Sequence, residues 1–481
     1  MDFPIAFETK DFIGLALLIP AFLAVTIALF LLPKLREATI FLIVIGPILP
    51  LGLDIHFYGA DWYRGTIRGF EITYVDVLAS GLLTCVLLDP REKKLYWPAG
   101  LAPLLVFSLW ALITIVVMEP RIFGSYELSK MLRGFLLLLV AAFSIRTERR
   151  IFIAIAGLAA AVSLQSLWGL YQWFSGTFRI TGTLEHANIL STYLCLITPV
   201  VAAAAASKHP PILLRAICWI AVIAAVPVIL LTLSRTGMPV FAFVVSASIV
   251  TCISWRPNPV KVGFALLGLL LVSGLVARSW EQVSLRYGEA TLAGEYFDEE
   301  SEGRGYYFRQ AKAILHNRPF GVGLNNWSYI VSKEFTTERG LRYANYDDLT
   351  AFRTRNEEIY SGAYAPPAHN LGLITLGEMG WVGLFLFVVA WFRWFHIALV
   401  NQFGKLQREF RFLSIGILFG LLGLFLQNLT EWTFRQSEVF MTFSLLLGIL
   451  AALHQAHKQP LAPGEEDEPE EKETEERIGN A

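Results

Sequence analysis

The chain has 481 residues, of which 55% are hydrophobic and 16% charged, and its formal net charge is −1. Its mean hydropathy is +0.53, and its apolar residues come in runs long enough to cross a bilayer, which excludes an ordinary soluble multidomain protein. The composition therefore predicts an all-α polytopic membrane protein. The four cysteines lie in or beside apolar runs and show no metal-ligand spacing, so they indicate neither a disulfide framework nor a metal site.

The apolar runs predict about twelve to thirteen transmembrane helices, since roughly 20 apolar residues cross the hydrocarbon core. The expected spans are 12–32, 38–54, 72–89, 97–118, 129–145, 151–174, 188–206, 213–233, 238–255, 261–279, 369–396, 412–428 and 438–455. The first follows an acidic-leaning segment and is long, so we interpret it as a retained span rather than a signal peptide. The chain thus divides into helices 1–10 (1–279), a large loop (280–368), helices 11–13 (369–457) and a disordered acidic tail (458–481).

Charges in the loops predict the orientation of these spans. Loops rich in lysine and arginine, such as 33–37, 146–150 and 256–261, alternate with poorer ones, and the basic set is expected in the cytoplasm together with the C-terminus. The segments expected outside are 55–71, 119–128, 175–187, 234–237, 280–368 and 429–437. The loop 280–368 is long enough for a small cap, and residues 302–317 within it are predicted to form a helix that ends at Arg318-Pro319.

Four cationic or titratable side chains are expected on this outer side: Arg179, Arg235, Arg304 and His369. A lone arginine at a membrane surface often only anchors a headgroup. Several of them next to span ends suit an anionic ligand, because guanidinium groups form forked hydrogen bonds to phosphate. Arg309 lies five residues beyond Arg304 and is expected on another part of the same helix.

His369 follows Pro366 and Pro367, which favour the start of a helix at this point. The free N–H groups and positive dipole end of that helix favour the neutral imidazole, which can accept a proton, and provide a local anion site. Asn370 could hydrogen-bond the ring or a sugar hydroxyl. The alternative is a histidine that simply caps a span at the interface.

Two further polar residues are candidate substrate contacts. Asn188 begins the span that follows the outer loop 175–187. Glu378 lies about 13 Å deeper than His369 along the same helix, where a carboxylate either pairs with a buried arginine or belongs to the site. The sequence contains no P-loop, Rossmann glycine pattern, GxSxG or HExxH, so no cofactor, metal or nucleotide chemistry is predicted.

Four stretches, taken in order, resemble the O-antigen ligase/polymerase superfamily of bacterial inner-membrane glycosyltransferases. They are RITGTLEHANILSTYL (179–194), LTLSRTG (231–237), GRGYYFRQAKAILHNRPFGVGLNNW (303–327) and AHNLGLITLGEMGWVGL (368–384). The resemblance implies a donor glycan on polyprenyl (undecaprenyl) diphosphate and an acceptor that is a glycan, a lipid A core or a protein. It also implies polysaccharide or lipopolysaccharide biosynthesis in the bacterial inner membrane, with the active site on the periplasmic side. The pattern leaves ligase and polymerase open.

The same resemblance implies that Arg235, Arg304 and His369 match the functional arginines and histidine of the superfamily. Together with the residue-level reasoning, this predicts a metal-independent glycosyltransferase. In it the arginines, with Arg179, neutralise the departing diphosphate, and His369 accepts the proton of the acceptor hydroxyl. Two other classes remain open: a transporter or flippase of lipid-linked oligosaccharides, which usually shows internal repeats and midplane charges, and a non-catalytic scaffold for envelope assembly.

Overall fold

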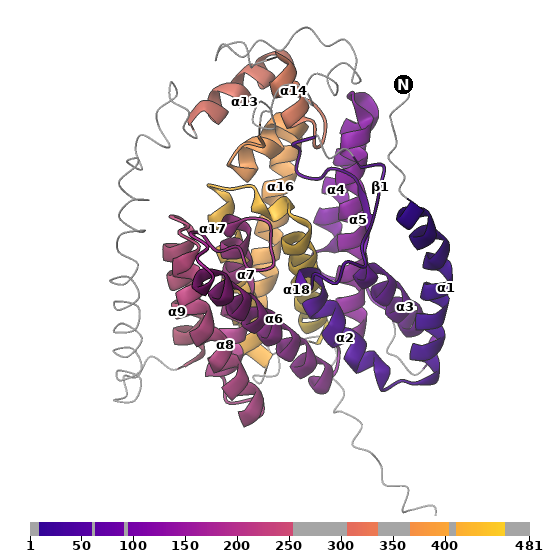
Figure 1. The fold of residues 1–481 in the computed structure, drawn as a ribbon, viewed down its shortest axis with the longest axis vertical. Helices are drawn as coiled ribbons and strands as arrows, with labels where there is room; N and C mark the ends of the chain where they lie inside the picture. The colour runs from indigo at the N-terminus through magenta and orange to yellow at the C-terminus, as the bar shows by residue number, and fades with distance from the viewer. Residues whose placement is uncertain are drawn as a thin grey trace, which may run out of the picture.

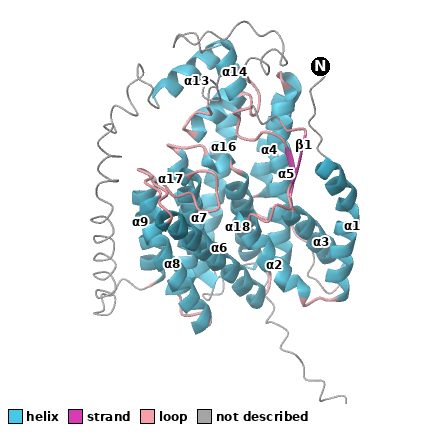
Figure 2. Cartoon of the chain, in the orientation of Figure 1, coloured by secondary structure: helices cyan, strands magenta, loops and turns pink. Residues whose placement is uncertain are grey.

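The computed structural model describes residues 9–59, 63–90, 95–253, 305–334, 366–403 and 410–456, and these are almost entirely helical (Figure 2). The helices are α1 (Thr9–Leu31), α2 (Leu35–Ile45), α3 (Tyr74–Leu88), α4 (Leu101–Val117), α5 (Arg121–Ser144), α6 (Glu148–Phe174), α7 (Ala187–Ala206), α8 (Ile212–Leu231), α9 (Gly237–Cys252), α13 (Gly305–Asn317), α14 (Trp327–Glu334), α16 (Leu371–Phe403), α17 (Arg411–Asn428) and α18 (Ser437–Ala456), with the 3₁₀ turns η1 (Gly46–Ile48) and η4 (Thr433–Arg435). The predicted all-α architecture is confirmed.

Seven of the described helices are long and apolar enough to cross a membrane, namely α1, α6, α7, α8, α16, α17 and α18. Three shorter apolar helices, α3, α4 and α9, accompany them. This confirms a polytopic membrane protein. The expected span 261–279 and most of the predicted cap lie outside the described residues.

One expected span is wrong. The prediction of a crossing at 38–54 fails because α2 has only 11 residues, about 16 Å of helix at the usual rise. The chain turns at once into η1, whose second residue is Pro47. Proline lacks the N–H that would continue the helix, so the helix ends well short of a bilayer thickness.

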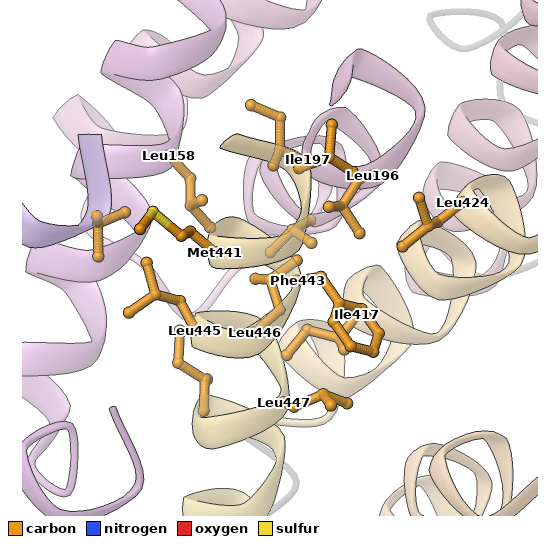
Figure 3. Packing of buried hydrophobic residues seen from close by; sticks show 14 of the residues in the cluster. Leu158, Leu196, Ile197, Ile417, Leu424, Met441, Phe443, Leu445, Leu446 and Leu447 are labelled. Atoms are coloured by element: carbon orange, nitrogen blue, oxygen red, sulfur yellow. The ribbon is translucent and has the colours of Figure 1, made fainter. Parts of the chain in front are cut away.

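The centre of the bundle is formed by α7 and α18, which are the most deeply buried of the long apolar helices. Helix α7 packs against α17, α9, α8 and α6, and α18 packs chiefly against α5. Figure 3 shows side chains of α18, such as Phe443 and Leu446, in one apolar cluster with Leu196 of α7 and Ile417 of α17. These two helices therefore set the positions of the segments that flank them.

Helix α17 lies unusually close to α7 because it presents glycines to that neighbour. A Cβ atom at Gly420 would collide with the carbonyl oxygen of Leu196, and Gly416 and Gly423 meet the α7 backbone in the same way. Small residues at such spacing let membrane helices approach closely. This packing brings the loop that follows Asn428 next to the start of α7.

Helix α16 is kinked at Gly380, whose φ of 64° lies in the left-handed region. The kink frees the carbonyls of Gly377 and Glu378, which accept hydrogen bonds from Val322 N (3.0 Å) and Gly323 N (2.8 Å). The segment after α13 is thereby attached to α16, and α13 and α14 lie over its beginning (Figure 1). Within the described residues, α13 confirms the helix predicted over 302–317.

The expected outer segment 55–71 forms a short antiparallel hairpin. Strands β1 (Ile55–Phe57) and β2 (Phe70–Ile72) pair with His56 opposite Glu71. The hairpin lies between α2 and α3 in the chain, and β2 contacts α5. It forms the one β-sheet among the described residues.

Candidate functional site

A cavity of about 740 Å³ opens at the end of the bundle where α16 begins, a volume typical of small-molecule sites. Its wall comes from four segments that are distant in sequence: residues 56–71, 179–189, 366–369 and 431–438. These belong to four of the segments predicted to lie on one side of the membrane. Arg179, Asn188 and His369, three of the predicted site residues, all line this cavity.

His369 is placed just before α16, and its Nδ1 lies 2.9 Å from Oε2 of Glu431. The histidine side chain is 35% exposed, whereas the glutamate is 5% exposed. A carboxylate at Nδ1 holds the proton on that nitrogen, so Nε2 is the ring nitrogen left with a lone pair for a substrate. The arrangement is a histidine oriented by a buried carboxylate, as in enzymes that use histidine as a base.

The hydrogen bonds continue from Glu431 along the cavity wall. Glu431 Oε1 accepts from Asn188 Nδ2 at 2.8 Å, and Asn188 Oδ1 accepts from the guanidinium of Arg179. Arg179 Nε donates to the carbonyl of Thr232 at 2.8 Å. Arg179 is therefore fixed relative to His369 by a continuous series of hydrogen-bonded side chains. In this series the carboxylate of Glu431 lies between the guanidinium and the imidazole.

The structure does not bring all the predicted cations to this cavity. Arg235 is half-buried in the turn between α8 and α9, and Arg309 is exposed on α13. Neither is among the described residues that line the cavity. Arg304 lies outside the described residues. Of the four side chains that were expected on one side, Arg179 and His369 therefore line the same cavity. The roles of Arg235 and Arg304 stay predictions.

Asn370 holds the backbone near His369. Its Oδ1 accepts from Leu373 N at 2.9 Å, and its Nδ2 donates to the carbonyl of Leu429 at 2.7 Å. The first bond caps the beginning of α16, and the second joins it to the loop that carries Glu431. These bonds give Asn370 a positioning role, and its substrate contact stays a prediction.

Glu378 is buried, with 1% of its side chain exposed, and its Oε2 lies 2.5 Å from Nη1 of Arg435. Its Oε1 also accepts from Trp327 N at 3.3 Å, and it does not line the cavity. Of the two interpretations that the sequence left open, the structure therefore supports the partner of a buried arginine. A substrate contact by Glu378 stays a prediction.

Of the described residues, Asp54, His56 and Glu71 form a group that could hold a metal ion, with ligand atoms within 4.8 Å of one another. Burial raises the pKa of the Asp54 carboxyl, and the nearby charge of Glu71 raises it further. Burial also disfavours ionised Glu71, but Arg133 at 2.5 Å outweighs it and lowers the pKa of Glu71. Arg133 would compete with a cation for Glu71, and the expected absence of a metal stays a prediction.

Sequence reasoning missed Glu431 and two arginines of the hairpin loop, Arg64 and Arg68, which also line the cavity. The signal for Glu431 was present: it is the acidic residue of the short predicted outer loop 429–437, between two spans. A carboxylate beside the hydrocarbon is costly unless it is paired or functional. Nothing in the sequence distinguishes Arg64 and Arg68 beyond their place in the expected outer segment 55–71.

Part of the chain matches a known family. Residues 216–388 match the family model described as O-antigen ligase, which confirms the resemblance to the O-antigen ligase/polymerase superfamily. The matched segment contains Arg235 and His369, whereas Arg179, Glu431 and the hairpin lie outside it. No curated protein matches the chain.

Proposed function

We propose that this O-antigen ligase-like enzyme of the bacterial inner membrane transfers a glycan from a polyprenyl diphosphate donor to an acceptor hydroxyl at the periplasmic face. The observation that carries the proposal is the His369–Glu431 pair in the wall of a cavity that also holds Arg179. The similarity to the superfamily supports the donor and acceptor classes. The acceptor is a glycan, a lipid A core or a protein.

In the proposed reaction, His369 Nε2 accepts the proton of the acceptor hydroxyl while that oxygen attacks the anomeric carbon of the donor sugar. The bond from the anomeric carbon to the diphosphate oxygen breaks, and its electron pair leaves with the polyprenyl diphosphate. Glu431, 2.9 Å from Nδ1, stabilises the imidazolium that forms. A positioned base of this kind contributes about 10²- to 10⁴-fold to a rate.

The departing diphosphate needs cations, and we propose that Arg179, which lines the cavity, provides one. Its guanidinium suits forked hydrogen bonds to phosphate oxygens, and fixed positive charge near a leaving group stabilises the transition state. Arg235 and Arg304 are proposed to add to this charge. With guanidinium groups at the leaving group, we propose that transfer needs no metal ion and continues in EDTA.

The test is reconstitution of the purified full chain in liposomes with a polyprenyl-diphosphate oligosaccharide and candidate acceptors, followed by sizing of the products. A single addition to a foreign acceptor indicates a ligase, and a ladder indicates a polymerase. His369→Ala is expected to lower transfer by about 10²-fold or more at unchanged expression. His316→Ala, which changes an exposed histidine of α13, is the matched control.

Two outcomes would contradict the proposal. Wild-type turnover by a folded His369→Ala variant would remove the histidine from the chemistry. Movement of the lipid-linked glycan across the membrane without any glycosyl transfer, under all acceptor conditions, would identify a transporter instead.

A further inference from the structure

The cavity wall contains a second cationic element that the proposed chemistry does not use. Arg64 and Arg68 lie in the segment that connects β1 to β2, and both line the cavity with His369 and Arg179. Arg68 is exposed and Arg64 is half-buried. Both lie outside residues 216–388, the part of the chain that matches the family model.

The backbone between these two arginines is held by buried side chains of other elements. Thr66 N donates to Oδ1 of Asn325 at 2.9 Å, and the Thr66 hydroxyl donates to Glu127 Oε2 at 2.9 Å. Asn325 in turn donates through Nδ2 to the carbonyl of Ile67 at 3.0 Å. Thr66, Asn325 and Glu127 are all buried, so these bonds form in a dry environment where leaving them unmade would be costly.

The residues at the start of the loop are fixed as well. Tyr63 is buried and stacks on Phe123 with ring centroids 3.7 Å apart, and its hydroxyl donates to the carbonyl of Asn325. Ser328 Oγ donates to the carbonyl of Arg64 at 3.0 Å. A loop that only anchored lipid headgroups would not need such ordering. A loop that presents two guanidinium groups at a set position benefits from it, because ordering before binding lowers the cost of binding.

The acidic groups of the same wall are partly committed elsewhere. Glu431 is bonded to His369 and Asn188, and Glu71 is paired with Arg133 at 2.5 Å. Glu185 and Glu438 complete the carboxylates that line the cavity. Arg64 and Arg68 are the cationic groups that the hairpin contributes to this wall, and two guanidinium groups suit a second anionic group on a bound substrate.

We propose that Arg64 and Arg68 bind a phosphate group of the acceptor and so select phosphorylated acceptor glycans. This inference rests on the proposed function, in which His369 activates the acceptor hydroxyl. Arg179 is tied to His369 through Glu431 and Asn188, so it is the arginine placed for the donor diphosphate at the reacting carbon. The hairpin loop, like residues 179–189 and 431–438 of the wall, lies outside the matched segment 216–388, and it carries the two cavity arginines to which the donor chemistry assigns no role.

The test compares two forms of one acceptor probe: the deacylated, phosphorylated core oligosaccharide of a lipopolysaccharide, and the same oligosaccharide after removal of its phosphates with hydrogen fluoride. For wild-type protein in nanodiscs, kcat/KM is expected to be at least about tenfold higher with the phosphorylated form, since hydrogen bonds to charged groups are the stronger ones. The double variant Arg64→Gln/Arg68→Gln should lose this preference. Its KM for the donor and its kcat/KM for the dephosphorylated probe should stay unchanged.

Arg121→Gln is the matched control, because Arg121 is an exposed arginine at the start of α5, paired with Glu119 at 3.1 Å. Thermal unfolding of each variant checks that the fold is intact. Equal kcat/KM of the wild type for both probes would overturn the inference while leaving the transferase activity established. A raised donor KM in the double variant, with no change in acceptor preference, would assign the arginines to the donor diphosphate and overturn it too.

Calorimetric titration separates this inference from the proposed function. If no probe is glycosylated, tighter binding of the phosphorylated probe to wild type than to the double variant would support the phosphate site by itself. Equal binding of both probes to wild type would overturn it.

Discussion

Two side-chain pairs, each with a buried carboxylate, connect the same two segments of the molecule, and they differ mainly in exposure. His369 and Glu378 lie on residues 366–378, and their partners Glu431 and Arg435 lie on residues 429–437. The first pair, at 2.9 Å, includes a histidine with 35% of its side chain exposed in the cavity wall. In the second, at 2.5 Å, the side chains are 1% and 6% exposed. The first pair is therefore open to the cavity, whereas the second is closed off from solvent.

The buried pair also positions the exposed one. The carbonyl of Arg435 accepts a hydrogen bond from Lys130, and Lys130 forms an ion pair with Glu127 at 2.8 Å. These contacts fix η4 against α5 and α16, and Glu431 lies only four residues before Arg435. The loop 429–437 thus carries Glu431, which pairs with a histidine in the cavity wall, and Arg435, which forms a buried ion pair. Access to solvent distinguishes the two pairs.

The largest expected effect comes from breaking the buried pair. Glu378→Ala would leave the Arg435 guanidinium buried without its carboxylate, and removal of one partner of such a pair costs about 3–5 kcal/mol. We expect a large fall in the unfolding temperature of the purified protein and in its yield, with loss of transfer as a consequence.

The double variant Glu378→Met/Arg435→Met is the control for this change, because replacing both charges by apolar side chains of similar length avoids the unpaired ion. It should recover much of the lost stability. A Glu378→Ala variant with the wild-type unfolding temperature but without transfer would contradict the comparison and return Glu378 to the substrate site.

The second prediction concerns the exposed pair. Glu431→Gln removes the charge that holds the His369 imidazole and stabilises its protonated form, so we expect transfer to fall by about 10²- to 10⁴-fold. The unfolding temperature should change little, because the buried pair still fixes the loop. Transfer rates and thermal unfolding measured on the same preparation check both statements.

Glu334→Gln is the matched control, since Glu334 pairs with Arg318 at 2.7 Å far along the chain from this loop. If Glu431→Gln lowered the unfolding temperature as much as Glu378→Ala does, the His369–Glu431 pair would be structural and the proposed base would lose its support.

Much of the fold could be predicted from the sequence, because membrane spans depend on local properties of the chain. Length and hydrophobicity located the positions of α7, α16 and α18, and α13 followed from apolar spacing with a proline stop. The failure at 38–54 was also local: the apolar run continues, but Pro47 lacks the N–H that would continue the helix. Hydropathy alone does not show that a helix ends within an apolar run.

The site could be predicted only in part, because its contacts are non-local. His369 was found through the prolines before it, but its partner Glu431 is 62 residues away. Their approach depends on the packing of α16 against α17, which no single residue reveals. The same limit explains Glu378, for which the sequence left two roles open until the position of Arg435 was known.

The smallest expected effect concerns Asn370, whose substitution tests how far the two pairs depend on each other. Asn370→Ser keeps an oxygen that can cap Leu373 N but loses the bond from Nδ2 to Leu429 O, which joins the two segments. We expect the free energy of unfolding to fall by about 1 kcal/mol and transfer to fall less than about tenfold, a factor worth about 1.4 kcal/mol, because Glu378 and Arg435 still hold the loop that carries Glu431. Asn370→Ala removes the cap as well and should cost roughly another 1 kcal/mol. Chemical unfolding and the transfer assay measure the two effects.

The contrary outcome is that Asn370→Ser lowers transfer as much as Glu431→Gln does, while the stability stays at the wild-type value. Asn370 would then contact the substrate and would belong to the site together with His369 and Glu431.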